Sequence, residues 1–132
     1  MPVREVSAEV VTSALHTPFV TALRRTTQVE TVLVRVVDSD GAAGRGEGPQ
    51  TWRITGESLA SVAACVNGPL REAVVGSDPD DLNAILDRVD EAVFGNYTAK
   101  AAVDEALHDL AAQRLGVPLT RLLGGGGHAV PT

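Results

Sequence analysis

The chain has 132 residues, of which 44% are hydrophobic, and this is enough for one globular domain with a modest core. Its net charge is −6, only 3% of its residues are aromatic, and Lys100 is its one lysine, so it is a poor candidate for binding nucleic acid or an anionic membrane surface. No apolar run is long enough to span a membrane, no signal peptide is recognisable, and a single cysteine, Cys65, fits a reducing cytoplasm.

The first third of the sequence predicts β-strands. Alternating and β-branched residues occur over 3–15. A second strand is predicted over 28–38, because Val32, Val34 and Val36 fall on one face of an extended chain. The segment between these strands, which contains Pro18 and Phe19, is expected to be a loop.

A tight turn should follow the second strand. Ser39-Asp40-Gly41 is a hairpin signal, because Asp-Gly accepts the positive φ of a tight turn. A third strand is predicted over 42–47. Its glycines, Gly44 and Gly46, indicate either a bulge or the close approach of another backbone.

The rest of the sequence predicts helices. The first is capped by Thr55 or Ser58 and should be kinked at Gly68-Pro69. Its apolar stripe recurs at helical spacing and consists of Leu59, Val62, Ala63, Val66 and Leu70.

The second helix is expected to start with Ser77 or Asp78 as cap and Pro79 in the first helical position. Asp80 and Asp81 would then face the positive end of its dipole. Gly95 should stop it. Its apolar stripe is Leu82, Ile85, Leu86, Val89 and Val93.

The third helix is predicted over 98–115, followed by a Gly116 stop and a short turn over 118–123. The glycines of 124–127 favour a linker. The apolar stripe of the third helix is rich in alanine, which permits close packing. It consists of Ala99, Ala102, Val103, Ala106, Leu107, Leu110 and Ala111. The predicted fold class is therefore α+β, a three-stranded antiparallel meander followed by three to four helices.

Most motifs that suggest chemistry have a simpler structural interpretation. The segment 44–48 lacks the spacing and the following helix of a phosphate loop. Asp78, Asp80 and Asp81 lack the glycine and distal glutamate of a calcium loop, and helix capping would explain them. His108 follows Asp104 by four residues, which favours a surface ion pair over a metal site. Cys65 is expected to be a small buried hydrophobe.

Two arginines invite a functional interpretation. Arg24 and Arg25 lie in the predicted loop between the first two strands. Loops often carry function, and a guanidinium can hold a carboxylate with two parallel hydrogen bonds. Solvated arginines that bind nothing are the alternative.

Several motifs together make the chain resemble the N-terminal domain of the mandelate racemase / muconate-lactonising branch of the enolase superfamily. PFVTALR and ITGES resemble the corresponding stretches of L-Ala-D/L-Glu and other dipeptide epimerases, and AKAAVD opens the third helix. The matching segments are 18–24, 40–41, 44–47, 54–58, 95–96, 99–104, 109–110, 116–119 and 122–125.

This resemblance implies that 1–125 form a capping domain and that 126–132 are a linker and the start of an absent (β/α) barrel. In the full-length enzyme a barrel lysine would remove an α-proton, and Mg²⁺ held by barrel carboxylates would stabilise the enediolate. A second lysine would return the proton on the opposite face. We expect no catalytic residue and no metal ligand in this chain, which would be inactive alone.

The resemblance also implies a substrate-binding role for two loops. Arg24 is expected to hold the distal carboxylate of a glutamyl or aspartyl side chain, with Arg25 as the alternative. Phe19 and Ile54 would form apolar walls. Trp52 lies in the second loop, but its role has no counterpart in the resemblance.

The expected partners are the protein's own barrel domain, a small dipeptide or other carboxylate substrate, and further copies of the enzyme, without nucleic acid or membrane. Two alternatives remain. The chain is either the cap of another superfamily member, a muconate cycloisomerase or an o-succinylbenzoate synthase, or a stand-alone protein-interaction module.

Overall fold

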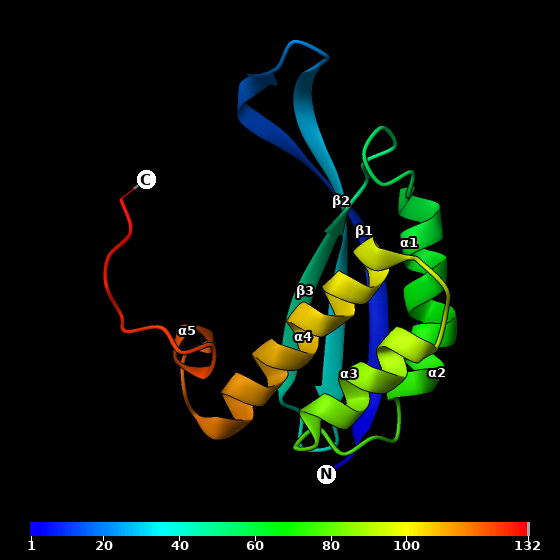
Figure 1. Ribbon diagram of the computed structural model, residues 1–132, viewed down its shortest axis with the longest axis vertical. Coiled ribbons are helices and arrows are strands. Elements are labelled where there is room, and N and C mark those ends of the chain that lie inside the picture. The colour runs from blue at the N-terminus through cyan, green and yellow to red at the C-terminus, as the bar shows by residue number, and fades with distance from the viewer. Residues whose placement is uncertain (132) are drawn as a thin grey trace.

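A computed structural model describes residues 1–131 and shows an antiparallel sheet in the order β1-β2-β3, with helices on one face (Figure 1). This confirms the predicted α+β class. The strands are β1 (Val3–Val20), β2 (Arg25–Asp38) and β3 (Ala43–Pro49). The helices are α1 (Leu59–Cys65), the π-helical turn η1 (Val66–Leu70), α2 (Arg71–Val74), α3 (Leu82–Glu91), α4 (Tyr97–Leu115) and α5 (Leu119–Leu122).

The first two strands are longer than predicted. Their ladder continues to the pairs Phe19↔Thr26 and Val20↔Arg25, after a shift in register that follows Ala14↔Gln28. The predicted loop between the strands was therefore wrong, since only residues 21–24 connect them. Most side chains of this extension are exposed, so the sequence carries no alternation of buried and exposed residues there.

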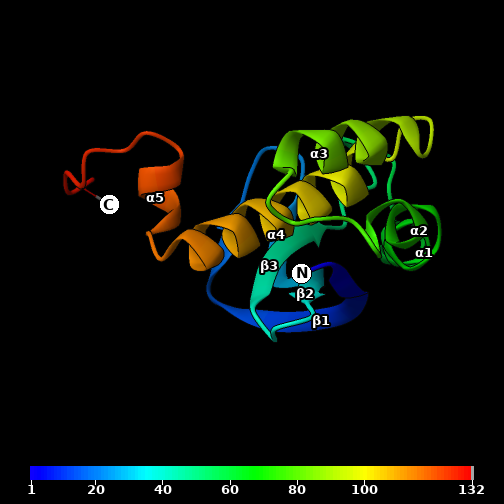
Figure 2. The same ribbon diagram turned by 90° about the horizontal axis from the view of Figure 1, so that it is seen from below.

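The core lies between the sheet and the helices, and Figure 2 shows that the other face of the sheet is uncovered by helices. Val32, Val34 and Val36 are buried, as predicted. Every residue of the predicted stripe on α4 is buried as well. Cys65 is also buried, which raises the pKa of its thiol.

Strand β3 and helix α4 pack backbone against backbone. A Cβ added to Gly44 would overlap the carbonyl oxygen of Ala106, and one added to Gly46 would overlap that of Ala102. The predicted close approach is thus confirmed. The alternative, a bulge, was wrong, because the β2–β3 register runs without a break from Thr31↔Pro49 to Val37↔Ala43.

Polar side chains of α4 bind the outer edge of β3. The amide of Arg45 donates to Asp109 at 2.9 Å, and the amide of Glu47 donates to Glu105 at 3.0 Å. Gln113 donates to the carbonyl of Ala43 at 2.7 Å. Four helical residues rise about 6 Å and two strand residues about 6.6 Å, so successive contacts stay in step along the two elements.

Helix starts were predicted with mixed success. Ser58 caps α1, and a reciprocal bond from its amide to Ser61 completes a capping box. The kink is at Gly68, whose backbone is non-helical, next to Pro69. Gly116, with positive φ, ends α4 as predicted, whereas the predicted stop of α3 at Gly95 was wrong, because that helix ends at Glu91 with Ala92 as C-cap.

The predicted start of α3 was wrong. The helix begins at Leu82 with Asp81 as N-cap, and Asp81 makes no side-chain capping bond. The Asp78 carboxylate instead accepts a hydrogen bond from the amide of Asp80 and closes a turn. Ser77 is engaged by Arg88, whose Nη2 donates to its hydroxyl at 2.6 Å. Helix capping therefore does not explain the roles of Asp78 and Asp80.

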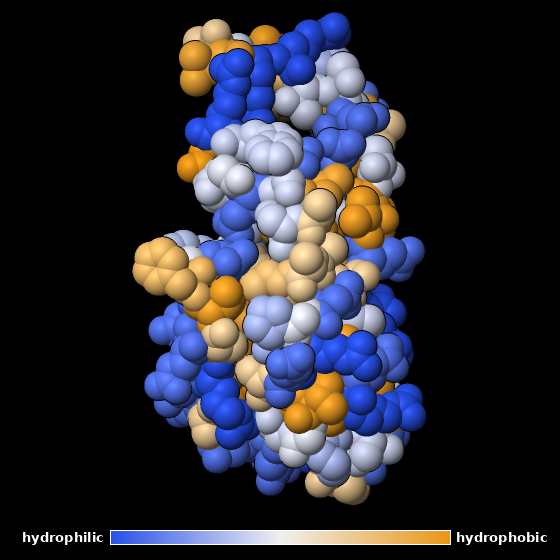
Figure 3. All heavy atoms as spheres, turned by 90° about the vertical axis from the view of Figure 1, so that its right-hand side faces the viewer, coloured by the Kyte–Doolittle hydropathy of each residue, from blue (hydrophilic) through white to orange (hydrophobic). Residues whose placement is uncertain are grey.

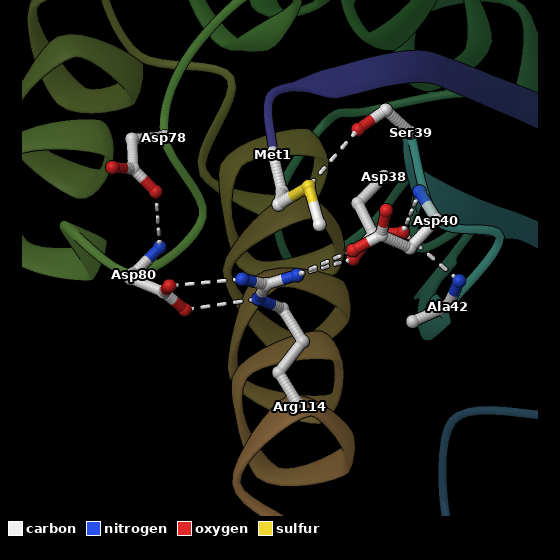
Figure 4. A network of polar contacts seen from close by, with 8 residues as sticks. All are labelled: Met1, Asp38, Ser39, Asp40, Ala42, Asp78, Asp80 and Arg114. Carbon is white, nitrogen blue, oxygen red and sulfur yellow. Dashed lines mark hydrogen bonds and ion pairs between the residues drawn. The ribbon is translucent and has the colours of Figure 1, made fainter.

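Arg114 of α4 joins two segments at the lower end of the sheet, as Figure 4 shows. Its Nε and Nη2 donate to Asp80 at 2.9 and 2.8 Å, and its Nη1 donates to the buried Asp38 at 2.7 Å. Burial alone would raise the pKa of Asp38. Hydrogen bonds from Arg114 and from the amides of Ala42 and Asp40 outweigh this effect and lower it.

The predicted ion pair on the third helix agrees with the structure. His108 Nδ1 lies 2.9 Å from Oδ1 of Asp104, which confirms the i,i+4 pair. A pair that was not predicted joins Lys100 Nζ to Oδ1 of Asp90 at 3.2 Å. Gly41 has the positive φ that the predicted turn requires.

Candidate substrate-binding groove

The upper end of the molecule carries the two segments singled out in the sequence. In Figure 1 the ends of β1 and β2 rise beyond the helices as a hairpin, and the loop that follows β3 lies beside it. We call residues 15–28 the hairpin and residues 50–57 the loop.

The hairpin is closed by Thr21. Its amide donates to the carbonyl of Arg24 at 2.8 Å. Its hydroxyl accepts from the amides of Leu23 and Arg24 at 3.3 and 3.2 Å. These hydrogen bonds form a local turn, and the turn fixes the position of Arg24 at the end of the hairpin.

The loop is anchored at both ends. Gln50 Nε2 donates to the Glu30 carboxylate at 3.2 Å, and Gln50 Oε1 accepts from the amide of Leu59 at 3.1 Å. At the other end the Glu57 carboxylate accepts bonds from the amide of Thr98, at 3.1 Å, and from its hydroxyl, at 2.7 Å. Glu57 thereby supplies a cap to α4, whose own N-cap, Asn96, makes no side-chain capping bond.

The middle of the loop folds around Thr51. The Thr51 carbonyl accepts the amides of Ile54 and Thr55 at 3.0 Å, and the two threonine hydroxyls lie 2.9 Å apart. This turn leaves Trp52 and Arg53 exposed at its tip. The tip is therefore held in place by the loop's own hydrogen bonds.

A groove of about 510 Å³ separates the hairpin and the loop. Arg24 of the hairpin lines it, together with Trp52 and Arg53 of the loop. Neither arginine forms an ion pair with any of residues 1–131. The remaining lining residues are Thr26, Gln28, Val29, Glu30, Pro49, Gln50 and Thr51.

Some of the residues singled out in the sequence line the groove, and others do not. Arg24 lines the groove, as does Trp52. Phe19 and Ile54 are exposed, by 56% and 77%, but neither contributes to the lining. Arg25 lies in β2 opposite Val20 and is outside the lining. Binding by Arg24, Phe19 and Ile54 stays a prediction.

Exposed apolar side chains also occur at this end. Figure 3 shows a few hydrophobic groups among mainly hydrophilic atoms at the top of this face. Exposed apolar residues of the hairpin and the loop are Phe19, Val20, Leu23, Trp52 and Ile54.

The sequence did not indicate that Arg53 lines the groove or that the loop is anchored at both ends. A lone arginine in a loop has no recognisable pattern. Gln50 and Glu57 bind Glu30 and Thr98, 20 and 41 residues away, and no sequence spacing reports such pairs.

Two further features bear on the chemistry. Within residues 1–131, no three His, Cys, Asp or Glu side chains are grouped so that they could hold a metal ion. The residues present therefore do not form a Mg²⁺ site, and we derive no metal-dependent step from them. In the same part of the chain, no helix is long and apolar enough to cross a membrane.

Comparison with known proteins agrees with the fold and the motifs. Residues 3–124 match the family model described as mandelate racemase / muconate lactonizing enzyme, N-terminal domain. L-Ala-D/L-Glu epimerase of Clostridium acetobutylicum is 41% identical over 84% of this chain and 31% of its own length. Muconate cycloisomerase 1 of Pseudomonas putida is 38% identical over 76% of this chain and 28% of its own.

A solved structure gives the same result. The substrate-liganded complex of L-Ala-D/L-Glu epimerase from Bacillus subtilis superimposes with a TM-score of 0.89 at 38% identity, covering 95% of this chain and 35% of that one. The chain spans about a third of the length of the curated relatives it matches. It belongs to the mandelate racemase / muconate lactonizing enzyme family of the enolase superfamily, as an N-terminal domain most similar to those of dipeptide epimerases.

Proposed function

We propose that this domain is the substrate-specificity cap of an isomerase that epimerises dipeptides of the Ala-Glu type. The reaction would be α-proton abstraction through an enediolate, on a barrel domain of the same protein. We propose a Mg²⁺ requirement for that enzyme, with ligands outside the residues described here. Alone, this domain would be inactive.

One observation carries the proposal. Arg24 lines a groove at the exposed end of the domain, with no acidic partner among residues 1–131. A guanidinium held in this way can bind the side-chain carboxylate of a substrate with two hydrogen bonds. The two relatives named epimerases above act, by their names, on Ala-Glu, which carries such a carboxylate.

The residues of this chain would bind and orient the substrate. Arg24 would hold the distal carboxylate, and the apolar Phe19 and Ile54 would cover the substrate and exclude water. Anchoring by Gln50 and Glu57 keeps the loop in one position, which reduces the entropy lost on binding.

A second candidate is the cap of a muconate cycloisomerase, favoured by the 38% identity to such an enzyme. Muconate carries two carboxylates, so the arginines of the groove suit it as well. A stand-alone interaction module would instead bind a protein partner and need no barrel.

The test uses the full-length protein that carries this chain. Exchange of the α-hydrogen of L-Ala-L-Glu for deuterium in D₂O, followed by NMR, measures epimerisation, and loss of muconate absorbance measures cycloisomerisation. Exchange with the dipeptide supports the proposal. Turnover of muconate alone would favour the second candidate, and turnover of neither would contradict both.

Two variants then test the role of Arg24. Arg24→Met should raise the KM for Ala-Glu at least tenfold more than the KM for Ala-Ala, because one charged hydrogen-bonded contact is lost. Arg25→Met removes the same charge from the neighbouring residue, outside the groove lining, and should change both values equally. The reverse pattern would transfer the role to Arg25.

A further inference from the structure

The groove contains a second guanidinium that the proposed grip by Arg24 does not use. Arg53 belongs to the loop, whereas Arg24 belongs to the hairpin, and both residues line the same groove. Two like charges in one groove repel each other unless a ligand neutralises them. The arrangement therefore favours a ligand with two separate negative charges.

The one acidic side chain of the lining does not pair with either arginine. Glu30 is half-buried, and its carboxylate accepts a hydrogen bond from Gln50 at 3.2 Å. It makes no ion pair among residues 1–131. Its role in the groove is to hold the loop through Gln50, and both guanidinium groups stay available to a ligand.

Size and surface also fit a short peptide. Clefts that bind small molecules commonly enclose about 300–1,000 Å³, and the volume of this one is about 510 Å³. The Trp52 side chain, 64% exposed next to Arg53, offers a flat apolar surface for the methylene groups between two carboxylates.

We propose that Arg24 and Arg53 each bind one side-chain carboxylate of the same substrate, and that the preferred substrates are dipeptides in which both residues are acidic. This inference rests on the proposed function, since it names the substrate class of the same groove. It assigns Arg53 as a specificity-determining residue and Trp52 as the surface that separates the two carboxylates.

The kinetic test compares L-Glu-L-Glu with L-Ala-L-Glu in the full-length protein. Wild type should have the higher kcat/KM with Glu-Glu. Arg53→Met should lower kcat/KM for Glu-Glu about tenfold and leave that for Ala-Glu within about twofold. Arg45→Met is the matched control, because Arg45 is an exposed arginine outside this groove, and it should change neither value.

A binding test separates failure of this inference from failure of the proposed function. Calorimetric titration of the full-length protein with Glu-Glu and with its neutral analogue Gln-Gln needs no turnover. Wild type should bind Glu-Glu at least tenfold more tightly than Gln-Gln, and Arg53→Met should abolish most of that difference. The inference is overturned if Arg53→Met keeps the wild-type preference, or if it weakens Ala-Glu as much as Glu-Glu.

Discussion

The same two strands, β1 and β2, serve two different regions. Under the helices one face of these strands is buried, as at Val6, Val32 and Val34, and α4 locks the sheet through Gly46 and Arg114. Beyond the helices the strands form the hairpin, which is exposed and closed by its own turn at Thr21. Packing therefore fixes the lower region, whereas the upper region is free to carry side chains that suit a substrate.

The largest expected effect is in the lower region. Gly46→Ala places a Cβ against the backbone carbonyl of Ala102, which cannot move aside without shifting α4. We expect the free energy of unfolding to fall by more than about 3 kcal/mol, measured by urea denaturation. Gly126→Ala, whose Cβ meets only the exposed His128, should be nearly neutral. Equal stability of both variants would refute the tight β3–α4 packing.

Arg114→Met should have the next largest effect. It leaves the carboxylate of Asp38 buried without its cation, at an expected cost of about 2–4 kcal/mol at pH 7. Arg121→Met, a change at an exposed arginine of α5, should cost less than about 0.5 kcal/mol.

The stability difference between wild type and Arg114→Met should depend on pH. The pKa of Asp38 is lower in the folded protein than its ordinary value of 3.8, so wild-type stability is present above pH 4 and declines as the pH falls below it. In Arg114→Met the hydrogen bond from Arg114 is lost while the amides of Ala42 and Asp40 still donate, so the pKa of Asp38 should be higher than in the wild type. The stability gap between the two proteins should therefore narrow between pH 7 and pH 3, and a constant gap would contradict the role of this pair.

Glu57→Gln tests the junction between the two regions. The amide keeps one acceptor for Thr98 but loses the charge at the start of α4, so we expect a loss of about 0.5–1 kcal/mol. Faster hydrogen exchange at the Thr98 amide should accompany it. Unchanged exchange would mean that Glu57 does not anchor the loop.

The smallest effect on stability is expected in the upper region. Arg24→Met should change the free energy of unfolding by less than about 0.5 kcal/mol, because the side chain is exposed and makes no ion pair with residues 1–131. Denaturation of the variant used in the kinetic assay measures this directly. If the free energy of unfolding fell by more than about 1 kcal/mol, Arg24 would contribute to packing, which contradicts the proposal that this region serves binding alone.

Periodicity predicted the buried parts of the fold well. The stripe on α4 and the three valines of β2 repeat at the spacing of their element, because one face of each is removed from water. The start of α3 was wrong because Asp80 is engaged by Arg114, a residue 34 positions away. The hairpin was underestimated because its exposed residues face no core.

The groove was predictable only in part. Arg24 could be singled out because it lies in a stretch that resembles a family motif. Arg53 could not, since only folding brings its loop opposite the hairpin. Long-range contacts that join two exposed segments leave no periodic trace in a sequence.

The row of α4 side chains along β3 has a consequence for how large the sheet can become. Asp109 and Glu105 occupy the amides of Arg45 and Glu47 that a neighbouring strand would use. Helix α4 thus takes the place of a fourth strand, so that a strand of another chain cannot pair with this edge of β3.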